Sequence, residues 1–255
     1  MAKEDCKFCG GTGWIVAEAD GVSSAKRCDC VEDAQGEELL ARAQIPDNYR
    51  NASFDIDWPQ GNPIARDILQ RALLPIKAYA NNFPVLKDKL GLLLVGPQGV
   101  GKTHLAVAVL HELLARGHEG IFFNYQTLLE KIRSGYNEKM GMSDREAYQT
   151  ALETEVLLLD DLGAHRVTDW VEDTVTSIIT YRCNYRKPLI ATTNFPDPDM
   201  GGKVVEKTAP GAAVKYNIRD TLEERIGPRA RSRLFEMCTV VPMWGLADYR
   251  QKTKR

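Results

Sequence analysis

Leu92-Leu-Leu-Val-Gly-Pro-Gln-Gly-Val-Gly-Lys-Thr-His104 is the stretch that decides the fold of this 255-residue chain. Its apolar start, Leu92 to Val95, predicts a buried strand, and a glycine-rich turn follows from Gly96 to Gly101. Lys102 and Thr103 then open an amphipathic helix. A strand, a glycine-rich turn and a helix in this order are the context of a phosphate-binding loop. The alternative is a glycine-rich turn that arose by chance.

The residue types in this loop suit phosphate binding. Glycines let successive backbone N–H groups turn toward phosphate oxygens, and the helix N-terminus adds the positive end of its dipole. Lys102 is expected to reach the β- and γ-phosphates, and the Thr103 hydroxyl is expected to bind Mg²⁺. We therefore predict a nucleotide site formed by Gly96, Pro97, Gln98, Gly99, Val100, Gly101, Lys102, Thr103 and His104.

Composition limits the class of protein. With 44% apolar and 27% charged residues, the chain can bury one α/β core and carry a small appendage. The net charge of −2 argues against a protein permanently coated with DNA, although local patches can still contact phosphate. The start of the chain has no apolar signal region, and no apolar run is long enough to span a bilayer. We expect a cytoplasmic protein with no membrane partner.

Four of the six cysteines lie near the start of the chain, as the close pairs Cys6 and Cys9, then Cys28 and Cys30. Two such pairs are typical of two knuckles that close tetrahedrally on one Zn²⁺. The second pair has one intervening residue where two or more are usual, which weakens the pattern. The alternatives are a disulfide pair or four unrelated thiols, and a cytosolic protein keeps disulfides reduced.

Two further apolar strands end in polar residues. The run Val156 to Asp160 is followed by Asp161, and in a phosphate-binding enzyme the first carboxylate would hold Mg²⁺ while the second orients the attacking water. The strand Pro188 to Thr192 leads to Asn194, whose amide would lie between the γ-phosphate and the acidic pair. Taken alone, a strand that runs into an acidic turn is common.

An arginine cluster follows near the C-terminus: Arg225, Arg229, Arg231 and Arg233. If Pro228 begins a helix, Arg229 and Arg233 are four residues apart and share a face. Such a run is usually a solvated face. The functional alternative is a guanidinium offered to the nucleotide of a neighbouring subunit.

The order of these motifs resembles the AAA+ ATPases of the DnaC/DnaI helicase-loader group, which includes the transposition helper IstB. The resemblance covers residues 45–250 and is carried by the lead-in Ile45-Pro-Asp-Asn-Tyr-Arg50 and by Gly96-Pro-Gln-Gly-Val-Gly-Lys-Thr103, Leu158-Leu-Asp-Asp-Leu-Gly163, Thr192-Thr-Asn194, Arg229-Ala-Arg-Ser-Arg233 and Ala247-Asp-Tyr-Arg250. The Asp-Asp pair, the lead-in and the Asp-Tyr-Arg ending are the more particular signals.

The resemblance implies ATP as the nucleotide and a five-stranded parallel sheet with helices on both faces, in which the Asn194 strand lies between the other two. It implies catalytic roles for Lys102, Asp160, Asp161 and Asn194, and an arginine finger in a site between subunits, with Arg233 first and Arg229 second. Asp161 stands where most AAA+ proteins carry Glu, which favours a slow switch over a motor. A full helical lid with its sensor arginine is not expected.

The division that follows is a four-cysteine zinc-binding module (1–36), a helical linker and lead-in (37–85) and an AAA+ ATPase domain (86–255). The resemblance implies a loader that delivers a hexameric replicative helicase to single-stranded DNA, and a homo-oligomer when ATP and DNA are bound. The zinc-like module would bind the partner. A DNA contact would involve the segment around Tyr125 to Tyr136, with Lys131 and Arg133.

Three alternatives stay open. The same chemistry could serve a transposase. A P-loop small-molecule kinase is disfavoured because no second substrate module is visible and because the arginine cluster suits a site completed in trans. The third alternative is a zinc-bearing adaptor that binds ATP without hydrolysing it.

Overall fold

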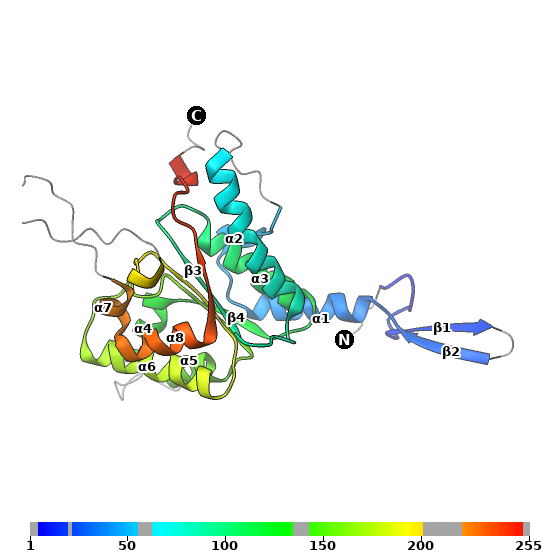
Figure 1. The fold of residues 1–255 in the computed structure, drawn as a ribbon. Helices are drawn as coiled ribbons and strands as arrows, with labels where there is room; N and C mark the ends of the chain where they lie inside the picture. Colours follow the sequence, from blue (N-terminus) through cyan, green and yellow to red (C-terminus); the bar gives the residue numbers. More distant parts are fainter. Residues whose placement is uncertain (1–4, 20–21, 56–62, 135–142, 201–220, 252–255) are drawn as a thin grey trace, which may run out of the picture.

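The core of the computed structural model, which describes residues 5–19, 22–55, 63–134, 143–200 and 221–251, is one parallel sheet (Figure 1). From edge to edge its strands are β4 (Gly120–Asn124), β5 (Val156–Asp160), β6 (Leu189–Thr193), β3 (Gly91–Val95) and β7 (Cys238–Pro242). The predicted five-stranded sheet is therefore confirmed. As the resemblance implied, β6, which leads to Asn194, lies between β3 and β5.

Helices cover both faces of this sheet, which is why its central strands are continuous apolar runs. Along β3, Leu92 and Leu94 pack into one core, and Leu93 and Val95 pack into the other. The first core contains α2 (Pro63–Asn82) and α3 (Lys102–Ala115). The second contains α4 (Tyr125–Ser134), α5 (Ser143–Glu153), α6 (Asp169–Asn184), α7 (Leu222–Ile226) and α8 (Pro228–Met237).

Parallel pairing places the carboxyl ends of β3, β5 and β6 at one edge of the sheet, called the carboxyl edge below. The loop between β3 and α3 starts there, and Asp161 and Asn194 follow β5 and β6 at the same edge. Strand β7 pairs with β3 and returns the chain to that edge, where the short helix η3 (Tyr249–Gln251) follows. The fold thus gathers residues from four parts of the sequence at this edge.

An arm extends from the core at the N-terminal side (Figure 1). It contains the hairpin β1 (Trp14–Ala19) and β2 (Val22–Arg27), then α1 (Cys30–Arg42). Helix α1 packs on α3, and the Phe122 N–H donates to the Ala43 carbonyl at 2.8 Å, which fastens the arm to the edge strand β4. The short helix η1 (Asp47–Tyr49) follows.

The predicted division at residue 36 falls inside α1, so the cysteine module and the linker share one helix. The three-part division of the chain stays a prediction. Within the described part of the chain, every helix is too short or too polar to span a bilayer.

Candidate nucleotide and metal sites

The loop between β3 and α3 has the shape that its glycines allow. Gly99 and Gly101 have φ values of 76° and 91°, in the left-handed region that favours glycine. A Cβ on Gly99 would lie 1.9 Å from Oδ1 of Asp248, so the C-terminal segment closes tightly over the loop. The Tyr249 N–H also donates to the Gly99 carbonyl at 2.9 Å.

Beside this loop lies a cavity of about 610 Å³ at the carboxyl edge. Of the predicted nucleotide-binding residues, Gly96 and Pro97 do not line this cavity, and Val100 is fully buried in the core. The cavity is lined by Gln98, Gly99, Gly101, Lys102, Thr103 and His104 from the predicted set, by Asp160, Asp161 and Asn194, and by Asn48, Tyr49, Tyr249 and Arg250.

The Lys102 ammonium is buried and held by three acceptors. Nζ donates to the carbonyls of Gly96 at 2.9 Å and Pro97 at 2.7 Å, and to Oδ1 of Asn194 at 2.6 Å. Burial lowers the pKa of Lys102 to about 8, and the nearby carboxylates, Asp161 first, oppose that shift. Lys102 is therefore fixed at the loop, in surroundings where burial disfavours its charged form.

Asp160 lies at the tip of β5 and accepts two hydroxyl hydrogen bonds. Oδ1 receives one from Thr103 Oγ1 at 2.8 Å and one from Thr192 Oγ1 at 2.7 Å. Burial raises the pKa of Asp160 above its ordinary value, because the charged form loses its hydration. A carboxylate and a hydroxyl side by side are the oxygen ligands that Mg²⁺ prefers, so Thr103 and Asp160 fit the predicted magnesium position.

Asp161 and Asn194 lie between the Thr103–Asp160 pair and Lys102. Asp161 has a φ of 57°, rare for a residue with a side chain, and its N–H donates to Thr192 Oγ1 at 3.0 Å. Its Oδ1 accepts from Asn194 Nδ2 at 2.9 Å. The Asn194 amide therefore bridges Lys102 and Asp161. The structure brings Lys102 and Thr103 of the P-loop together with Asp160, Asp161 and Asn194 of the two strand tips.

Four lining residues were not predicted as site residues. Asn48 and Tyr49 belong to the lead-in, and Tyr249 and Arg250 belong to the Asp-Tyr-Arg ending. Both segments were singled out only for their family resemblance, and that was the available signal. Although no sensor arginine was expected after α8, Arg250 reaches the cavity from η3.

The arginine cluster does not reach the cavity of its own chain. Pro228 begins α8 as predicted, and Arg229 is exposed. The Arg233 Nη1 pairs with Glu236 Oε2 at 2.7 Å and its side chain is 44% exposed. Among the described residues that line the cavity, neither Arg229 nor Arg233 is present. The arginine-finger assignment therefore stays a prediction.

The four N-terminal cysteines converge in space. The sulfur atoms of Cys6, Cys9, Cys28 and Cys30 all lie within 4.8 Å of one another. The Sγ atoms of Cys6 and Cys28 are 3.7 Å apart, and those of Cys9 and Cys30 are 3.4 Å apart. A disulfide requires about 2.05 Å, whereas tetrahedral Zn–S bonds of about 2.3 Å place sulfurs about 3.8 Å apart. The cluster fits zinc.

The single-residue spacing of Cys28 and Cys30 also has a structural reason. Cys30 is the first residue of α1, so the chain turns into the helix between the two sulfurs. Backbone N–H groups of Phe8 and Cys9 lower the pKa of the Cys6 thiol to about 6, and the thiolate is the form that binds metal. Zinc at this cluster stays a proposal.

Only part of the predicted DNA-contact segment lies at the surface, and the DNA contact itself stays a prediction. Tyr125, the first residue of α4, is buried in the core, so it is not a surface contact. Lys131 and Arg133 are exposed on α4. Tyr136 lies outside the described residues, as does most of the loop-like insertion predicted from Phe195 to Asn217.

Comparison with known proteins agrees with this geometry. Residues 62–200 match the family model of the IstB-like ATP binding protein. The solved DnaC helicase loader is 32% identical with a TM-score of 0.59, over 77% of this chain and 99% of that structure. The Phage-like element PBSX protein XkdC of Bacillus subtilis is 24% identical over 86% of this chain and 87% of its own.

A third relative belongs to an insertion sequence. A putative ATP-binding protein in an insertion sequence of Mycobacterium tuberculosis is 30% identical over 46% of this chain and 49% of its own length. The matched family model covers more than half of this chain and includes the P-loop, both acidic residues and Asn194. The chain therefore belongs to the IstB-like ATP binding protein family and is a P-loop AAA+ ATPase of the type found in helicase loaders.

Proposed function

We propose that this protein is an ATP-dependent loader that delivers a hexameric replicative helicase to single-stranded DNA. The observation that carries the proposal is the hydrogen-bonded path from Lys102 through Asn194 to Asp161. Because one amide contacts both the phosphate-binding cation and the carboxylate beside it, a bound phosphate changes both contacts. That arrangement suits a switch that distinguishes ATP from ADP.

Each site residue has a role in this proposal. Lys102 binds the β- and γ-phosphates, and Thr103 with Asp160 holds Mg²⁺, which supplies positive charge for phosphoryl transfer when bound. Asp161 orients and deprotonates the attacking water. Its side chain is one methylene shorter than the usual Glu, which favours slow turnover. Arg250 adds a cation from the same chain.

The remaining charge comes from a second copy of the chain. Arg233, with Arg229 as the second choice, reaches the γ-phosphate of the neighbouring subunit in a homo-oligomer formed with ATP and DNA. Lys131 and Arg133 on α4 supply part of the single-stranded DNA contact.

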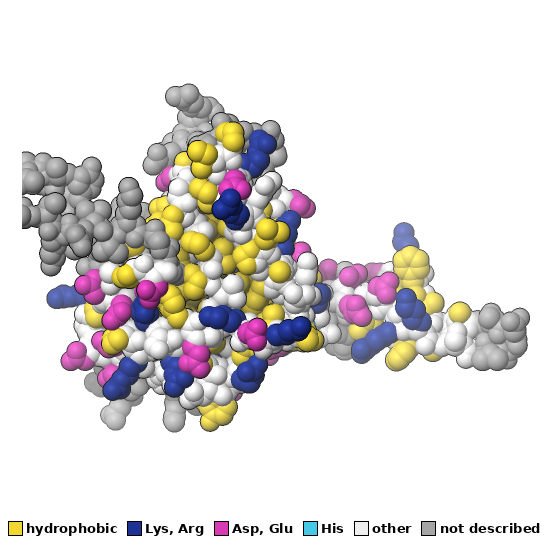
Figure 2. Space-filling model, viewed as in Figure 1, with side chains coloured by type: hydrophobic (Ala, Val, Ile, Leu, Met, Phe, Trp, Pro, Cys, Tyr) yellow, Lys and Arg dark blue, Asp and Glu magenta, His cyan; other side chains and the backbone are white. Residues whose placement is uncertain are grey.

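The N-terminal arm is the helicase-binding end in this proposal. Its apolar side chains are exposed: Phe8 at 81%, Val16 at 67% and Trp14 at 53%. Figure 2 shows apolar side chains on the surface of the arm, which projects away from the sheet. Exposed aromatic and branched side chains on a small module are typical of a protein-binding surface.

The test is a loading assay with the replicative helicase of the source cells. We expect the purified protein to bind that helicase and, with ATP, to place it on a closed single-stranded DNA circle. Trp14→Ala should lose helicase binding and keep ATP hydrolysis, whereas Ser24→Ala, on the other strand of the same hairpin, should keep both. Normal ATPase activity without helicase binding would contradict the loader assignment.

The second candidate is an ATPase helper of a transposase, favoured by the insertion-sequence relative. Affinity capture from the source cells distinguishes the two, because a helper should retain a transposase and no helicase. A nucleoside-acceptor assay run beside the ATPase assay tests the kinase alternative. ATP binding without hydrolysis, with DNA and partner present, would favour the adaptor.

A further inference from the structure

Two arginines of the cluster hold α7 and α8 to the tips of β5 and β6, and the proposed chemistry uses neither. Arg225 on α7 donates from Nε to the Gly163 carbonyl at 2.8 Å, and its guanidinium lies 4.7 Å from the centre of the Phe195 ring. Gly163 follows Asp161 by two residues, and Phe195 follows Asn194 directly. The α7–α8 unit is thus attached beside both catalytic strand tips.

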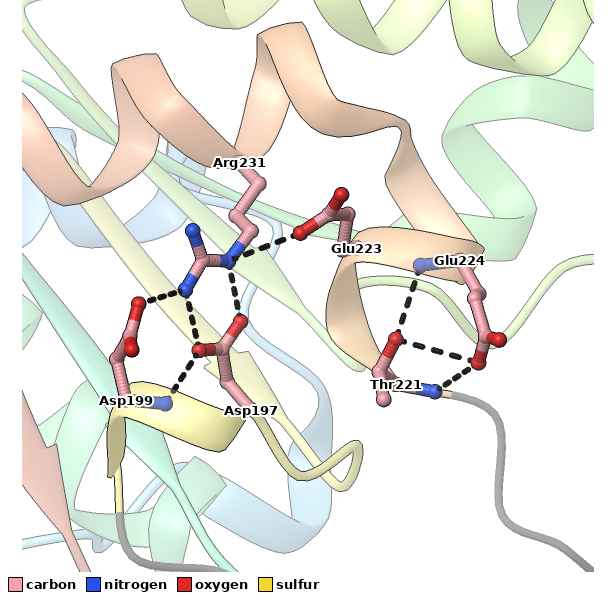
Figure 3. A network of polar contacts seen from close by, with 6 residues as sticks. All are labelled: Asp197, Asp199, Thr221, Glu223, Glu224 and Arg231. Carbon is pink, nitrogen blue, oxygen red and sulfur yellow. Dashed lines mark hydrogen bonds and ion pairs between the residues drawn. The ribbon is translucent and has the colours of Figure 1, made fainter. Parts of the chain in front are cut away.

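Arg231 on α8 makes the stronger attachment (Figure 3). Its Nε and Nη2 each donate to one oxygen of the Asp197 carboxylate, both at 2.5 Å. Asp197 is fully buried, whereas Asp199, which also contacts Nη2, and Glu223, 3.7 Å from Nε, are largely exposed. A bidentate pair with a buried carboxylate fixes both the position and the orientation of the guanidinium plane.

The geometry of α8 places Arg231 on a different face of the helix from Arg229 and Arg233. Residues two apart on an α-helix are rotated by about 200°, so Arg231 lies about 160° around α8 from both Arg229 and Arg233. The burial agrees: the Arg231 side chain is 18% exposed, Arg233 is 44% exposed and Arg229 is exposed. Anchoring Arg231 inward therefore turns Arg229 and Arg233 outward.

We infer that Arg231 is a positioning residue, whose ion pair with Asp197 sets the rotation of α8 relative to the end of β6. Asp197 lies three residues after Asn194, which accepts a hydrogen bond from Lys102. The ion pair therefore fixes the positions of Arg229 and Arg233, the arginines offered to a second copy of the chain, relative to the end of β6. The inference rests on the proposed role of Arg233, because it states how that side chain is aimed.

The test removes the ion pair without leaving a buried charge unpaired. In the double variant Arg231→Gln/Asp197→Asn, two neutral amides replace the pair. We expect wild-type ATP affinity and at least a tenfold lower ATPase rate with single-stranded DNA. Arg231→Lys, which keeps the charge but loses the bidentate contact, should show the same pattern more weakly. The matched control is Arg71→Gln/Asp67→Asn, an exposed pair on α2 at 3.0 Å, which should hydrolyse normally.

Subunit mixing separates positioning from a general structural role. Lys102→Ala protein has a disabled pocket and intact arginines, so mixing it with the double variant should restore activity as far as mixing it with Arg233→Ala does. Recovery in both mixtures supports the inference. Recovery only with Arg233→Ala overturns it and leaves the finger assignment standing, because the ion pair then serves its own pocket. No recovery with Arg233→Ala overturns both, and wild-type hydrolysis by the double variant overturns the inference alone.

Discussion

The carboxyl edge of the sheet and the N-terminal cysteine cluster both gather reactive side chains, but they are held in different ways. Lys102, Asp160 and Asn194 follow strands whose side chains fill two large apolar cores. In the arm, the buried apolar residues described are Cys9, Cys28 and Cys30 themselves. The first site is supported by a core, whereas the second is the core of its module.

This difference in apolar support predicts which of the two regions needs its ligand in order to fold. A parallel sheet places polar residues at its carboxyl edge whether or not a nucleotide is bound, because the strands are buried on both faces. A module of so few apolar residues cannot offset its conformational entropy without a metal or a disulfide. Removing nucleotide should therefore leave the fold intact, and removing zinc should unfold the arm.

Zinc removal has the largest expected effect. Purified protein should carry about one zinc per chain, and Cys9→Ser should release it, because structural zinc contributes about 10–16 kcal/mol of apparent binding energy. The arm should unfold while ATP binding persists. Elemental analysis and amide exchange measure these outcomes. Cys183→Ser, outside the cluster, should keep the zinc, and freshly purified protein without zinc would end the assignment.

Asp161→Asn tests the carboxyl edge through its effect on ATP hydrolysis. The amide keeps the size of the side chain but cannot accept a proton, so hydrolysis should fall by about 10²–10⁴-fold. Nucleotide affinity and the melting temperature should stay near wild type. Single-turnover ATPase and fluorescent-nucleotide titration give both values, with the exposed Asp173→Asn on α6 as control. Equal rates in wild type and Asp161→Asn would remove Asp161 from its role.

Lys102→Ala should have a smaller effect than Asp161→Asn, and the effect should be on ATP affinity. Loss of one charge-assisted contact to phosphate is worth about 1.5–3 kcal/mol, so ATP affinity should fall by about 10–150-fold. Thermal unfolding should change little without nucleotide, since the sheet core does not depend on Lys102. Unfolding of this variant at the assay temperature would break the comparison, because the pocket would then be part of the fold.

Much of the carboxyl edge could be predicted because its signals are local. Lys102 and Thr103 follow a strand and glycines directly. Asp160 ends one apolar strand, Asp161 comes directly after it, and Asn194 comes directly after another. Parallel strands of one sheet then bring these ends together. The burial of the Val100 side chain could not be predicted, because a contiguous motif does not show which side chain turns into the core.

Other features depend on contacts between distant parts of the chain. Strand β7 was not assigned from its residues, since it is a half-buried edge strand that ends in Pro242. Arg182 is fully buried, although its sequence neighbourhood suggests a surface arginine. Its guanidinium donates to the backbone carbonyls of Ala151, Leu152, Thr154, Glu155 and Pro188. Arg250 and Tyr49 reach the cavity from opposite ends of the chain, without any spacing signal.

The smallest expected effect is a pH dependence of ATP affinity. Burial lowers the pKa of Lys102 to about 8 in the free protein, against the opposing charges of Asp161 and Asp160 and with a further lowering by Arg250. Phosphate binding favours the ammonium, so the bound form retains its proton at higher pH than the free form does. Below pH 8 both forms are protonated and affinity should be flat. Above pH 8 binding must take up a proton, so affinity should fall by up to tenfold per pH unit, about 1.4 kcal/mol.

Nucleotide titration from pH 6.5 to about 9.5 measures this slope. Lys102→Ala is the matched control and should give a flat profile, because the group that titrates is gone. The same slope in Lys102→Ala would assign the titration to another group, and a wild-type profile flat to pH 9.5 would show that the buried ammonium keeps its ordinary pKa.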